Sequence, residues 1–407
     1  MPDTARVDAA TGAPRFHRST APPRSAVIVG AGVVGLACAW YLQEAGVEVT
    51  VAERDEVAAG SSWGNAGWLS PGLAVPLPEA SVLRFALRSV TDPASALYVP
   101  LRWDPSLWAW LSRFARHCTT AQWRRAMAAL VELNRYALDA YDQLTASGVA
   151  ATITEAPVVT AFEAPGEDGG FLRELDLAAA AGQPVDAQPL SGDQARAIVP
   201  QLSDRVASAW RLGGQRYLDP GAFVRALAES VVARGGRLAT GFAARTLRRG
   251  PRGVTVAGWG SAPLHGDVAV VAAGAWLDGL VRPLGVRVRV RAGRGYSFSL
   301  ATDRPLACPV YFPVPRVACT PYRGGVRVAG TMEFRGPDAP LDFGRVDAIV
   351  ARARPLLRGV DWASLADPWV GGRPVTPDGL PLIGRSADPA VHVAGGHGDF
   401  ELSNGTN

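Results

Sequence analysis

The stretch 25-SAVIVGAGVVGLACAWYLQEAGVEVTVAE-53 decides the fold of this chain of 407 residues. It opens with a short apolar run, rich in β-branched residues, of the kind that lies buried in a parallel sheet. Apolar residues then recur at helical spacing up to Gly46, which ends the helix, and a second apolar run covers 47–52. Strand, helix and strand together predict a βαβ unit.

The glycines between the first strand and the helix have the spacing of a dinucleotide-binding turn. In this pattern Gly30 allows the tight turn, Gly32 lets the backbone approach a pyrophosphate, and Gly35 lets the helix pack closely on the strand. The free N–H groups and positive dipole end of the helix favour an anion there. A carboxylate at Glu53 can accept hydrogen bonds from the ribose hydroxyls and repels a 2′-phosphate, which disfavours NADP. The predicted nucleotide contacts are Gly30, Gly32, Val33, Val34, Gly35, Glu53 and Arg54.

The next segment, 59-AGSSWGNAGWLSPG-72, favours FAD over NAD. Small residues let backbone amides and hydroxyls wrap around an extended ligand, whereas an NAD domain would normally continue into another βα unit. A loop exposed to solvent is the alternative. If the segment binds FAD, the predicted contacts are Ser61, Ser62, Asn65, Ala66 and Gly67.

Composition excludes several classes of protein. The chain is 48% hydrophobic and 19% charged, an ordinary globular composition, and its length favours two domains. All 41 basic residues are Arg, so neither a Walker lysine nor a pyridoxal phosphate lysine is present. The basic residues are spread among acidic ones, so we expect no nucleic acid partner. None of the four cysteines forms a Cys-x-x-Cys pair, which argues against a disulfide scaffold or zinc site.

Together with four later segments, these residues resemble the FAD-dependent D-amino acid dehydrogenases, within the wider group of D-amino acid, glycine and sarcosine oxidases. The resemblance covers about residues 25–398. The later segments are the helical stretch 108–130, 293-GRGYSFSL-300, 371-GGRPVTPDGLPLIGR-385 and 393-VAGGHG-398.

The resemblance implies an α/β fold in which a Rossmann-type FAD-binding domain is combined with a discontinuous α+β substrate domain. Neither domain is continuous in the sequence. We expect a disordered tail at 1–24, an FAD-binding domain made of 25–75, 190–290 and 366–407, and a substrate domain made of 76–189 and 291–365.

The resemblance also implies the substrate contacts. Arg373 occupies the position that binds the substrate carboxylate, a role that suits the forked guanidinium. A structural arginine bridging the turn at 376–379 is the alternative. Tyr296 is a weaker candidate for a second contact, with a core tyrosine as the alternative, and Tyr311 and Tyr322 are weaker still.

Glycines near the end of the chain would bring the backbone close to the flavin. The resemblance implies flavin contacts at Gly274, Gly396 and His397, and His397 is expected to influence the electronic properties of the flavin. Asp378, in Pro-Asp-Gly, is expected to be a turn residue rather than a general base. The remaining histidines show no partner pattern, so we expect no metal. The absence of Cys around 369–378 favours non-covalent FAD.

The resemblance implies that a neutral amine loses a hydride from its α-carbon to flavin N5, and that water hydrolyses the resulting imino acid. We therefore expect a D-amino acid dehydrogenase whose electron acceptor is a quinone or oxygen. The alternatives are an amine oxidase of the glycine or sarcosine oxidase type, or a flavoprotein fold with weak or no catalysis.

The last alternative arises from the end of the sequence. After Gly398 the resemblance implies a turn and a helix whose N-terminus approaches the flavin, but only 399-DFELSNGTN-407 follows. Such a short stretch cannot form a stable helix of that kind. We expect either that another element fills this role or that FAD binding and turnover are weak.

The composition and cysteine pattern predict a cytoplasmic location, and no stretch is apolar for long enough to span a bilayer. The tryptophan-rich segment 98–117 is predicted to be a core helix. The alternative is a peripheral contact with the inner face of the membrane, because Trp and Arg suit that interface.

Overall fold

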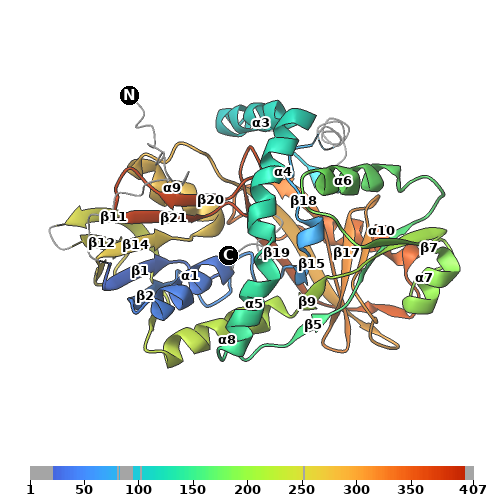
Figure 1. Cartoon of the computed structure of the whole chain (residues 1–407), viewed down its shortest axis with the longest axis horizontal. Helices are drawn as coiled ribbons and strands as arrows, with labels where there is room; N and C mark the ends of the chain where they lie inside the picture. Colours follow the sequence, from blue (N-terminus) through green and yellow to red (C-terminus); the bar gives the residue numbers. More distant parts are fainter. Residues whose placement is uncertain (1–21, 80–81, 83–94, 101–102, 251–252, 399–407) are drawn as a thin grey trace, which may run out of the picture.

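The computed structural model describes residues 22–79, 82, 95–100, 103–250 and 253–398. Most of the tail predicted to be disordered (1–24) and the final stretch (399–407) therefore lie outside the described residues. The described chain forms two parts, each built around its own large sheet, as Figure 1 shows.

The first part contains the predicted βαβ unit at the centre of a six-stranded sheet. All neighbouring strands run parallel except the last pair, β21 and β20. The strand order across the sheet is β10 (Arg237–Ala239), β2 (Glu48–Ala52), β1 (Ser25–Val29), β14 (Val268–Val271), β21 (Val391–Gly395) and β20 (Leu382–Arg385).

Helices α1 (Val33–Glu44) and α8 (Pro220–Ala233) pack on one face of this sheet. The start of α8 has a side-chain cap, because the Asp219 carboxylate accepts a hydrogen bond from the Ala222 amide at 3.1 Å and Pro220 is the first helical residue. Helix α5 (Ala137–Ala146) adds Tyr141 to the same apolar core. The opposite face is covered by β11 (Ala244–Gly250), β12 (Gly253–Gly258), β13 (Leu264–Gly266) and α9 (Leu277–Val281).

The second part is built on a nine-stranded sheet, and the long central strands pair antiparallel. Helix α10 (Phe343–Ala353) packs Val346 and Ile349 on one face of it. The strand order is β19 (Val360–Val375), β15 (Arg291–Thr302), β18 (Gly325–Phe334), β17 (Val317–Tyr322), β16 (Val310–Phe312), β6 (Val158–Phe162), β8 (Ser208–Leu212) and β7 (Ala187–Ser191), while β4 (Leu97–Tyr98) pairs with β18.

Further elements join or flank the two parts. Strands β3 (Trp68–Leu69), β9 (Arg216–Leu218) and β5 (Ile153–Glu155) form a small sheet. The helical region predicted at 108–130 forms two helices, which are separated at Cys118 and Thr119. The flanking helices are α3 (Pro105–His117), α4 (Thr120–Asn134), α6 (Gly169–Ala180) and α7 (Gly192–Ile198), and the 3-10 turns are η1 (Pro71–Leu73), η2 (Gly274–Trp276), η3 (Arg282–Leu284) and η4 (Arg354–Leu356).

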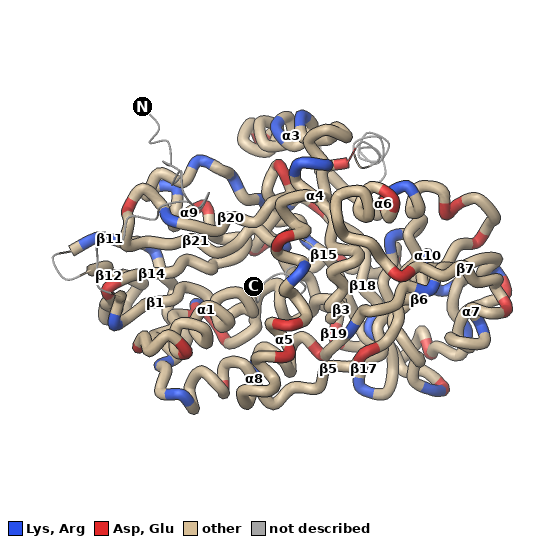
Figure 2. Tube along the Cα trace, in the orientation of Figure 1, with Lys and Arg blue, Asp and Glu red and all other residues tan. Residues whose placement is uncertain are grey.

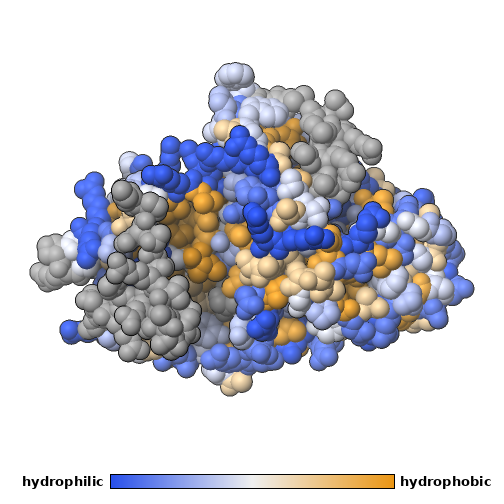
Figure 3. Space-filling view, turned by 45° about the horizontal axis from the view of Figure 1, so that its top comes forward, coloured by the Kyte–Doolittle hydropathy of each residue, from blue (hydrophilic) through white to orange (hydrophobic). Residues whose placement is uncertain are grey.

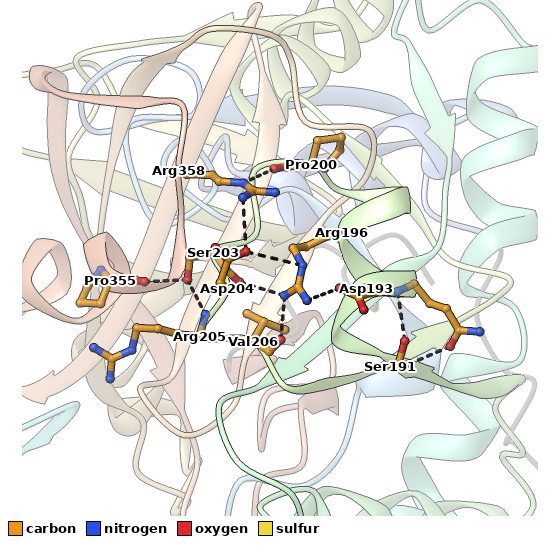
Figure 4. Close-up of polar contacts among 11 residues, drawn as sticks. Ser191, Asp193, Arg196, Pro200, Ser203, Asp204, Arg205, Val206, Pro355 and Arg358 are labelled. Atoms are coloured by element: carbon orange, nitrogen blue, oxygen red, sulfur yellow. Dashed lines mark hydrogen bonds and ion pairs between the residues drawn. The ribbon is translucent and has the colours of Figure 1, made fainter.

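Two predicted domain boundaries need correction. The sequence places 190–290 with the FAD-binding domain, yet β8 and the end of β7 belong to the nine-stranded sheet. Figure 4 shows α7 tied to this region, because Arg196 donates to the carbonyls of Ser203 and Val206. The boundary at 366 likewise falls inside β19. Short strands carry no local sign of which sheet they will join, so sequence alone misplaced these segments.

Candidate active site

The turn after β1 and the first turn of α1 each contain a position that accepts only glycine. Gly30 has φ of +112°, and a Cβ there would lie 2.4 Å from the carbonyl oxygen of Ala272. A Cβ on Gly35 would lie 2.0 Å from the carbonyl oxygen of Gly30. Both obstacles are backbone atoms, so the close approach of helix and strand depends on the missing side chains.

The start of α1 presents unpaired amides. Its N-cap is Gly32, which supplies no capping side chain, and the first turn contains no acidic residue. The Val33 amide donates to Ser62 Oγ at 3.2 Å. Within the described residues, the amides of Gly32, Val34 and Gly35 have no hydrogen-bond partner. Such a helix start suits an anion, because several N–H groups point at the same place.

The end of β2 brings a carboxylate to this turn. Glu53 Oε2 accepts a hydrogen bond from the Ala31 amide at 2.7 Å, and its Oε1 accepts one from the Asp55 amide at 3.0 Å. The neighbouring Arg54 lies with its guanidinium carbon 4.2 Å from the centre of the Trp276 ring and forms an ion pair with Asp338. Glu53 is therefore oriented towards the glycine turn.

The segment 59–72 lies between the two parts. Gly67 has φ of +82°, its carbonyl accepts a hydrogen bond from the Leu218 amide at 2.9 Å, and its amide donates to Asn65 Oδ1 at 3.0 Å. Ser61 and Ser62 are buried. The segment is thus packed into the molecule, which disagrees with the alternative of a solvent loop.

The C-terminal end of β19 is the point at which the predicted site residues meet. Val375 forms a bridge with His397, and a Cβ on Gly396 would lie 2.9 Å from the Thr376 side chain. A Cβ on Gly372 would lie 3.2 Å from the Ala275 side chain, next to Gly274. Trp369 fills the space beside Gly64, where a Cβ would come within 2.0 Å of its ring.

Arg373 lies on this same stretch and is partly buried. Its guanidinium lies over Gly295 of β15, where a Cβ would come within 2.5 Å of the guanidinium carbon. The glycine therefore leaves room for a flat cationic group on this face of the sheet. A guanidinium held in this way can bind a carboxylate through two parallel N–H donors.

His397 is neutral at physiological pH. Burial lowers its pKa to about 4, because the charged imidazolium would lose its hydration. Its Nδ1 atom is buried and has no hydrogen-bond partner among the described residues. A buried nitrogen without a partner at this position is open to contact with a bound group.

Tyr296 needs correction as a candidate substrate contact. Its side chain is 1% exposed, belongs to the core beneath α10, and donates its hydroxyl to Glu333 Oε1 at 2.7 Å. The core alternative therefore holds. The alternation of Tyr296, Phe298 and Leu300 with Ser297 and Ser299 was the sequence signal for this, because alternate residues of a strand share a face.

The other candidates lie as follows. Tyr311 makes an edge contact with Trp68 of the 59–72 segment, with ring centres 5.9 Å apart. Tyr322 lies under the guanidinium of Arg327. Asp378 Oδ1 accepts a hydrogen bond from the Leu380 amide at 3.2 Å, which is the predicted turn role. In the portion of the chain that the structure describes, no group of three or more His, Cys, Asp or Glu side chains could hold a metal ion.

Comparison with known proteins identifies the family. Residues 25–406 match the family model described as FAD dependent oxidoreductase, DAO. The chain belongs to this family. It is an FAD-dependent oxidoreductase, and the resemblance seen in the sequence is confirmed.

Curated relatives of this DAO family member cover most of the chain. The D-amino acid dehydrogenase of Cereibacter sphaeroides is 31% identical over 380 residues, which is 91% of this chain and 87% of that protein. The D-amino acid dehydrogenase of Xanthobacter autotrophicus is 31% identical over 386 residues, covering 91% of this chain and 90% of that protein.

Solved structures share the fold. Glycine oxidase from Bacillus cereus superposes with a TM-score of 0.71 at 20% identity, covering 94% of this chain and 93% of that one. L-α-Glycerophosphate oxidase from Mycoplasma pneumoniae with FAD bound gives a TM-score of 0.71 at 16% identity, covering 94% and 92%. The predicted α/β architecture of the DAO member is therefore confirmed.

The residues present fit FAD. The open amides at the start of α1 suit a pyrophosphate, and Glu53 is oriented towards the same turn. At the other end of the site, the buried Nδ1 of His397 has no partner among the described residues. The glycines around the end of β19 would allow the backbone to approach the flavin closely there.

Sequence reasoning missed four residues that shape this DAO site. Trp369 packs beside Gly64, while Ser297, Thr320 and Arg327 bond the 59–72 segment from the nine-stranded sheet. A charged or hydroxyl side chain within a strongly apolar strand is a usable signal, because a buried polar group needs a partner. The identity of that partner could not be predicted, since it lies far away in the sequence.

The pKa of His397 predicts a pH dependence of stability. The unfolded chain takes up a proton near pH 6.5, whereas the folded chain resists protonation until about pH 4. The free energy of unfolding should therefore be fully retained above pH 6.5 and fall between pH 6.5 and 4, by up to about 3 kcal/mol. Denaturant unfolding of the apoprotein at about pH 7 and about pH 4.5 measures it.

The variant His397→Gln should lose much less stability over that range than the unsubstituted chain. His265→Gln is the control, because the His265 side chain is exposed. An equal loss in His397→Gln and the unsubstituted chain would contradict the assignment of the low pKa.

Proposed function

We propose that this flavoenzyme oxidises the carbon–nitrogen bond of a D-amino acid and that Arg373 binds the substrate carboxylate. The carrying observation is the position of Arg373 over Gly295, on the stretch of β19 that also contacts Gly64 and His397. Similarity to relatives named D-amino acid dehydrogenase over 91% of this chain supports the D configuration.

Bound FAD would supply the two-electron acceptor for the hydride released from the substrate α-carbon. The start of α1 and the carboxylate of Glu53 would hold its nucleotide end, with Arg54 close by. The remaining proposed cofactor contacts are Ser61, Ser62, Asn65, Ala66, Gly67, Gly274 and Gly396. The proposed contact of Val34 is through its amide at the helix start. The Val33 amide already donates to Ser62 Oγ, so Val33 would approach the cofactor without donating a hydrogen bond to it.

Positioning supplies most of the catalytic effect in this proposal. Arg373 would fix the carboxylate, which leaves the α-carbon and the amine in one orientation relative to the rest of the site. His397 is neutral and adds no positive charge to this part of the site. Trp369, packed on the glycines at 64 and 371, would cover this region and exclude water.

Anaerobic flavin bleaching tests the function. The purified chain is loaded with FAD, its visible spectrum is recorded, and D- and L-amino acids are added without oxygen. We expect the flavin absorption to disappear with D-amino acids and to remain with their L-forms. Bleaching by glycine or sarcosine alone would favour the amine oxidase alternative, and bleaching by none of these compounds would favour a fold without catalysis.

The proposed electron acceptor is a membrane quinone, with oxygen as the alternative. Helix α3 buries Leu107, Trp110 and Phe114, as a core helix does, but Trp103 before it is 92% exposed and Trp108 on it is 41% exposed. Among the described residues, no helix has the length and apolar character required to cross a membrane. The exposed tryptophans instead suit a peripheral contact.

Basic residues lie on the same helix and beside its first turn. Arg113 and Arg116 are exposed on α3, and the side chain of Arg291 bonds Ser106 in the first turn of that helix. Figure 2 shows basic positions on α3, which stands at the top of the molecule. In Figure 3 a run of hydrophilic residues crosses the left and centre of the face in view, and hydrophobic residues lie next to it. Aromatic and cationic side chains together favour an anionic lipid surface.

Liposome binding tests this contact. The double variant Trp103→Ala and Trp108→Ala should reduce binding to vesicles containing anionic phosphatidylglycerol by about tenfold, because two interfacial rings are lost. Trp259→Ala is the control, since Trp259 is 73% exposed on a different part of the surface. Unchanged binding of the double variant, or no binding of the unsubstituted chain at low salt, would eliminate the contact.

A further inference from the structure

Four consecutive carbonyl groups of the 59–72 segment are bonded by side chains of the nine-stranded sheet. Ser297 Oγ donates to the carbonyl of Gly64 at 2.8 Å, and Thr320 Oγ1 donates to that of Ala66 at 2.7 Å. Arg327 Nη1 donates to the carbonyl of Trp63 at 3.0 Å and approaches that of Asn65 at 3.4 Å. We call Ser297, Thr320 and Arg327 the loop anchors.

Strand register explains why the loop anchors act together. Arg327 of β18 lies opposite Ser299 of β15 and opposite Thr320 of β17. Ser297 is two residues from Ser299 and therefore points to the same face of the sheet. The alternate residues Phe298 and Val328 point to the other face, into the core beneath α10. One face of three neighbouring strands thus carries all three donors.

Arg327 is an unusual residue to bury. Its side chain is 2% exposed, and it forms no ion pair within the described part of the chain. Its guanidinium lies 3.9 Å from the centre of the Tyr322 ring, and burial lowers its pKa. A buried charge costs stability, and apolar residues of similar size often stabilise a fold more. Stability alone therefore does not account for arginine at this position.

The anchored carbonyls determine where the amides of the segment point. In a trans peptide the N–H and C=O groups point in opposite directions, so a carbonyl bonded to the sheet leaves its peptide N–H directed away from it. Within the described residues, the amides of Gly64, Asn65 and Ala66 have no hydrogen-bond partner. The segment therefore presents a row of donors on the side opposite the anchors.

We propose that Arg327 is a positioning residue which, with Ser297 and Thr320, holds residues 63–66 so that their amides are oriented to bind FAD. The inference rests on the proposed contact between this segment and FAD. Under this proposal the part of the molecule built on the nine-stranded sheet determines the conformation of a cofactor-binding loop. The interactions that hold the loop exist before FAD binds.

FAD affinity and protease susceptibility of the apoprotein test the proposal, and neither needs a substrate. Arg327→Met should weaken FAD binding at least tenfold, measured by quenching of flavin fluorescence, and should speed chymotrypsin cleavage after Trp63 or Trp68 several-fold. Thr320→Val should change both quantities in the same direction by less. Arg327→Lys, which keeps N–H donors, should restore part of the affinity.

Arg345→Met is the matched control. Arg345 is also 2% exposed and bonds a backbone carbonyl, that of Ser95, but it lies on α10 at the other face of the sheet. It should leave FAD affinity and cleavage at Trp63 unchanged even if the thermal midpoint falls. Unaltered FAD affinity and cleavage in Arg327→Met would overturn the proposal.

If Arg327→Met does not fold, Ser297→Ala and Thr320→Val decide the outcome. Unchanged FAD affinity in both variants would then overturn the proposal. A failure of D-amino acids to bleach the flavin would refute the proposed function and leave this result untouched, because the affinity measurement contains no amino acid.

Discussion

Replacing Arg373 by methionine is expected to lower kcat/KM for D-amino acids by roughly a hundredfold to ten-thousandfold, mainly by raising KM. The variant would lose two charge-assisted hydrogen bonds, each contributing about 1.5–3 kcal/mol in a site partly excluded from water. About 1.4 kcal/mol corresponds to a factor of ten. FAD affinity should stay within about twofold, because the guanidinium serves the substrate.

Steady-state kinetics and FAD titration of the same preparations measure both effects. Arg385→Met is the control, because Arg385 is exposed on β20 of the other sheet. Gly295→Ala should also raise KM and is an independent test. Its Cβ would come within 2.5 Å of the Arg373 guanidinium carbon and must displace the guanidinium. An Arg373→Met enzyme with an unchanged KM would remove Arg373 from the substrate site.

Replacing Gly35 by alanine is expected to give a chain that is isolated without flavin. The added Cβ would lie 2.0 Å from the carbonyl oxygen of Gly30 and 3.3 Å from the side chain of Ile28. Backbone must move to relieve the first contact, which would push α1 away from β1 and turn its amides out of position. We expect FAD affinity to fall by more than a hundredfold and overpacking to cost about 1–3 kcal/mol of stability.

Visible absorbance, FAD titration and thermal unfolding measure these losses. Gly279→Ala is the matched control, because Gly279 is a helical glycine in α9 and an added Cβ would meet no atom within 4 Å. It should bind FAD normally and unfold at the same or a slightly higher temperature. Normal FAD binding by Gly35→Ala would mean that the close contact of α1 with β1 is not needed for the cofactor.

Interactions that are local in sequence made much of this protein predictable. The βαβ unit at 25–53 follows from apolar periodicity, and the start of α8 follows from Asp219 and Pro220. Gly30 and Gly35 were identifiable because a turn of this kind needs residues without a side chain. Arg373 and His397 came from family resemblance, which marked positions without giving their surroundings.

The site residues that sequence missed depend on contacts between distant segments. Ser297, Thr320 and Arg327 are ordinary strand residues until β15, β17 and β18 are placed side by side. Only then do they share one face and meet the carbonyls of residues 63–66. The misplacement of β8 has the same origin, because its partners β6 and β7 lie on separate segments.

The sequence by itself therefore determined the nucleotide-binding turn, the family and the identity of the cofactor. These features depend on backbone conformation and residue spacing within short stretches of the chain. The tertiary structure decided which face of the large sheet each side chain occupies. It placed Tyr296 in the core and Arg327 behind the 59–72 segment, and it joined Arg373 to His397 through the end of β19. Strand pairing fixes these relations, and pairing is a property of the whole chain.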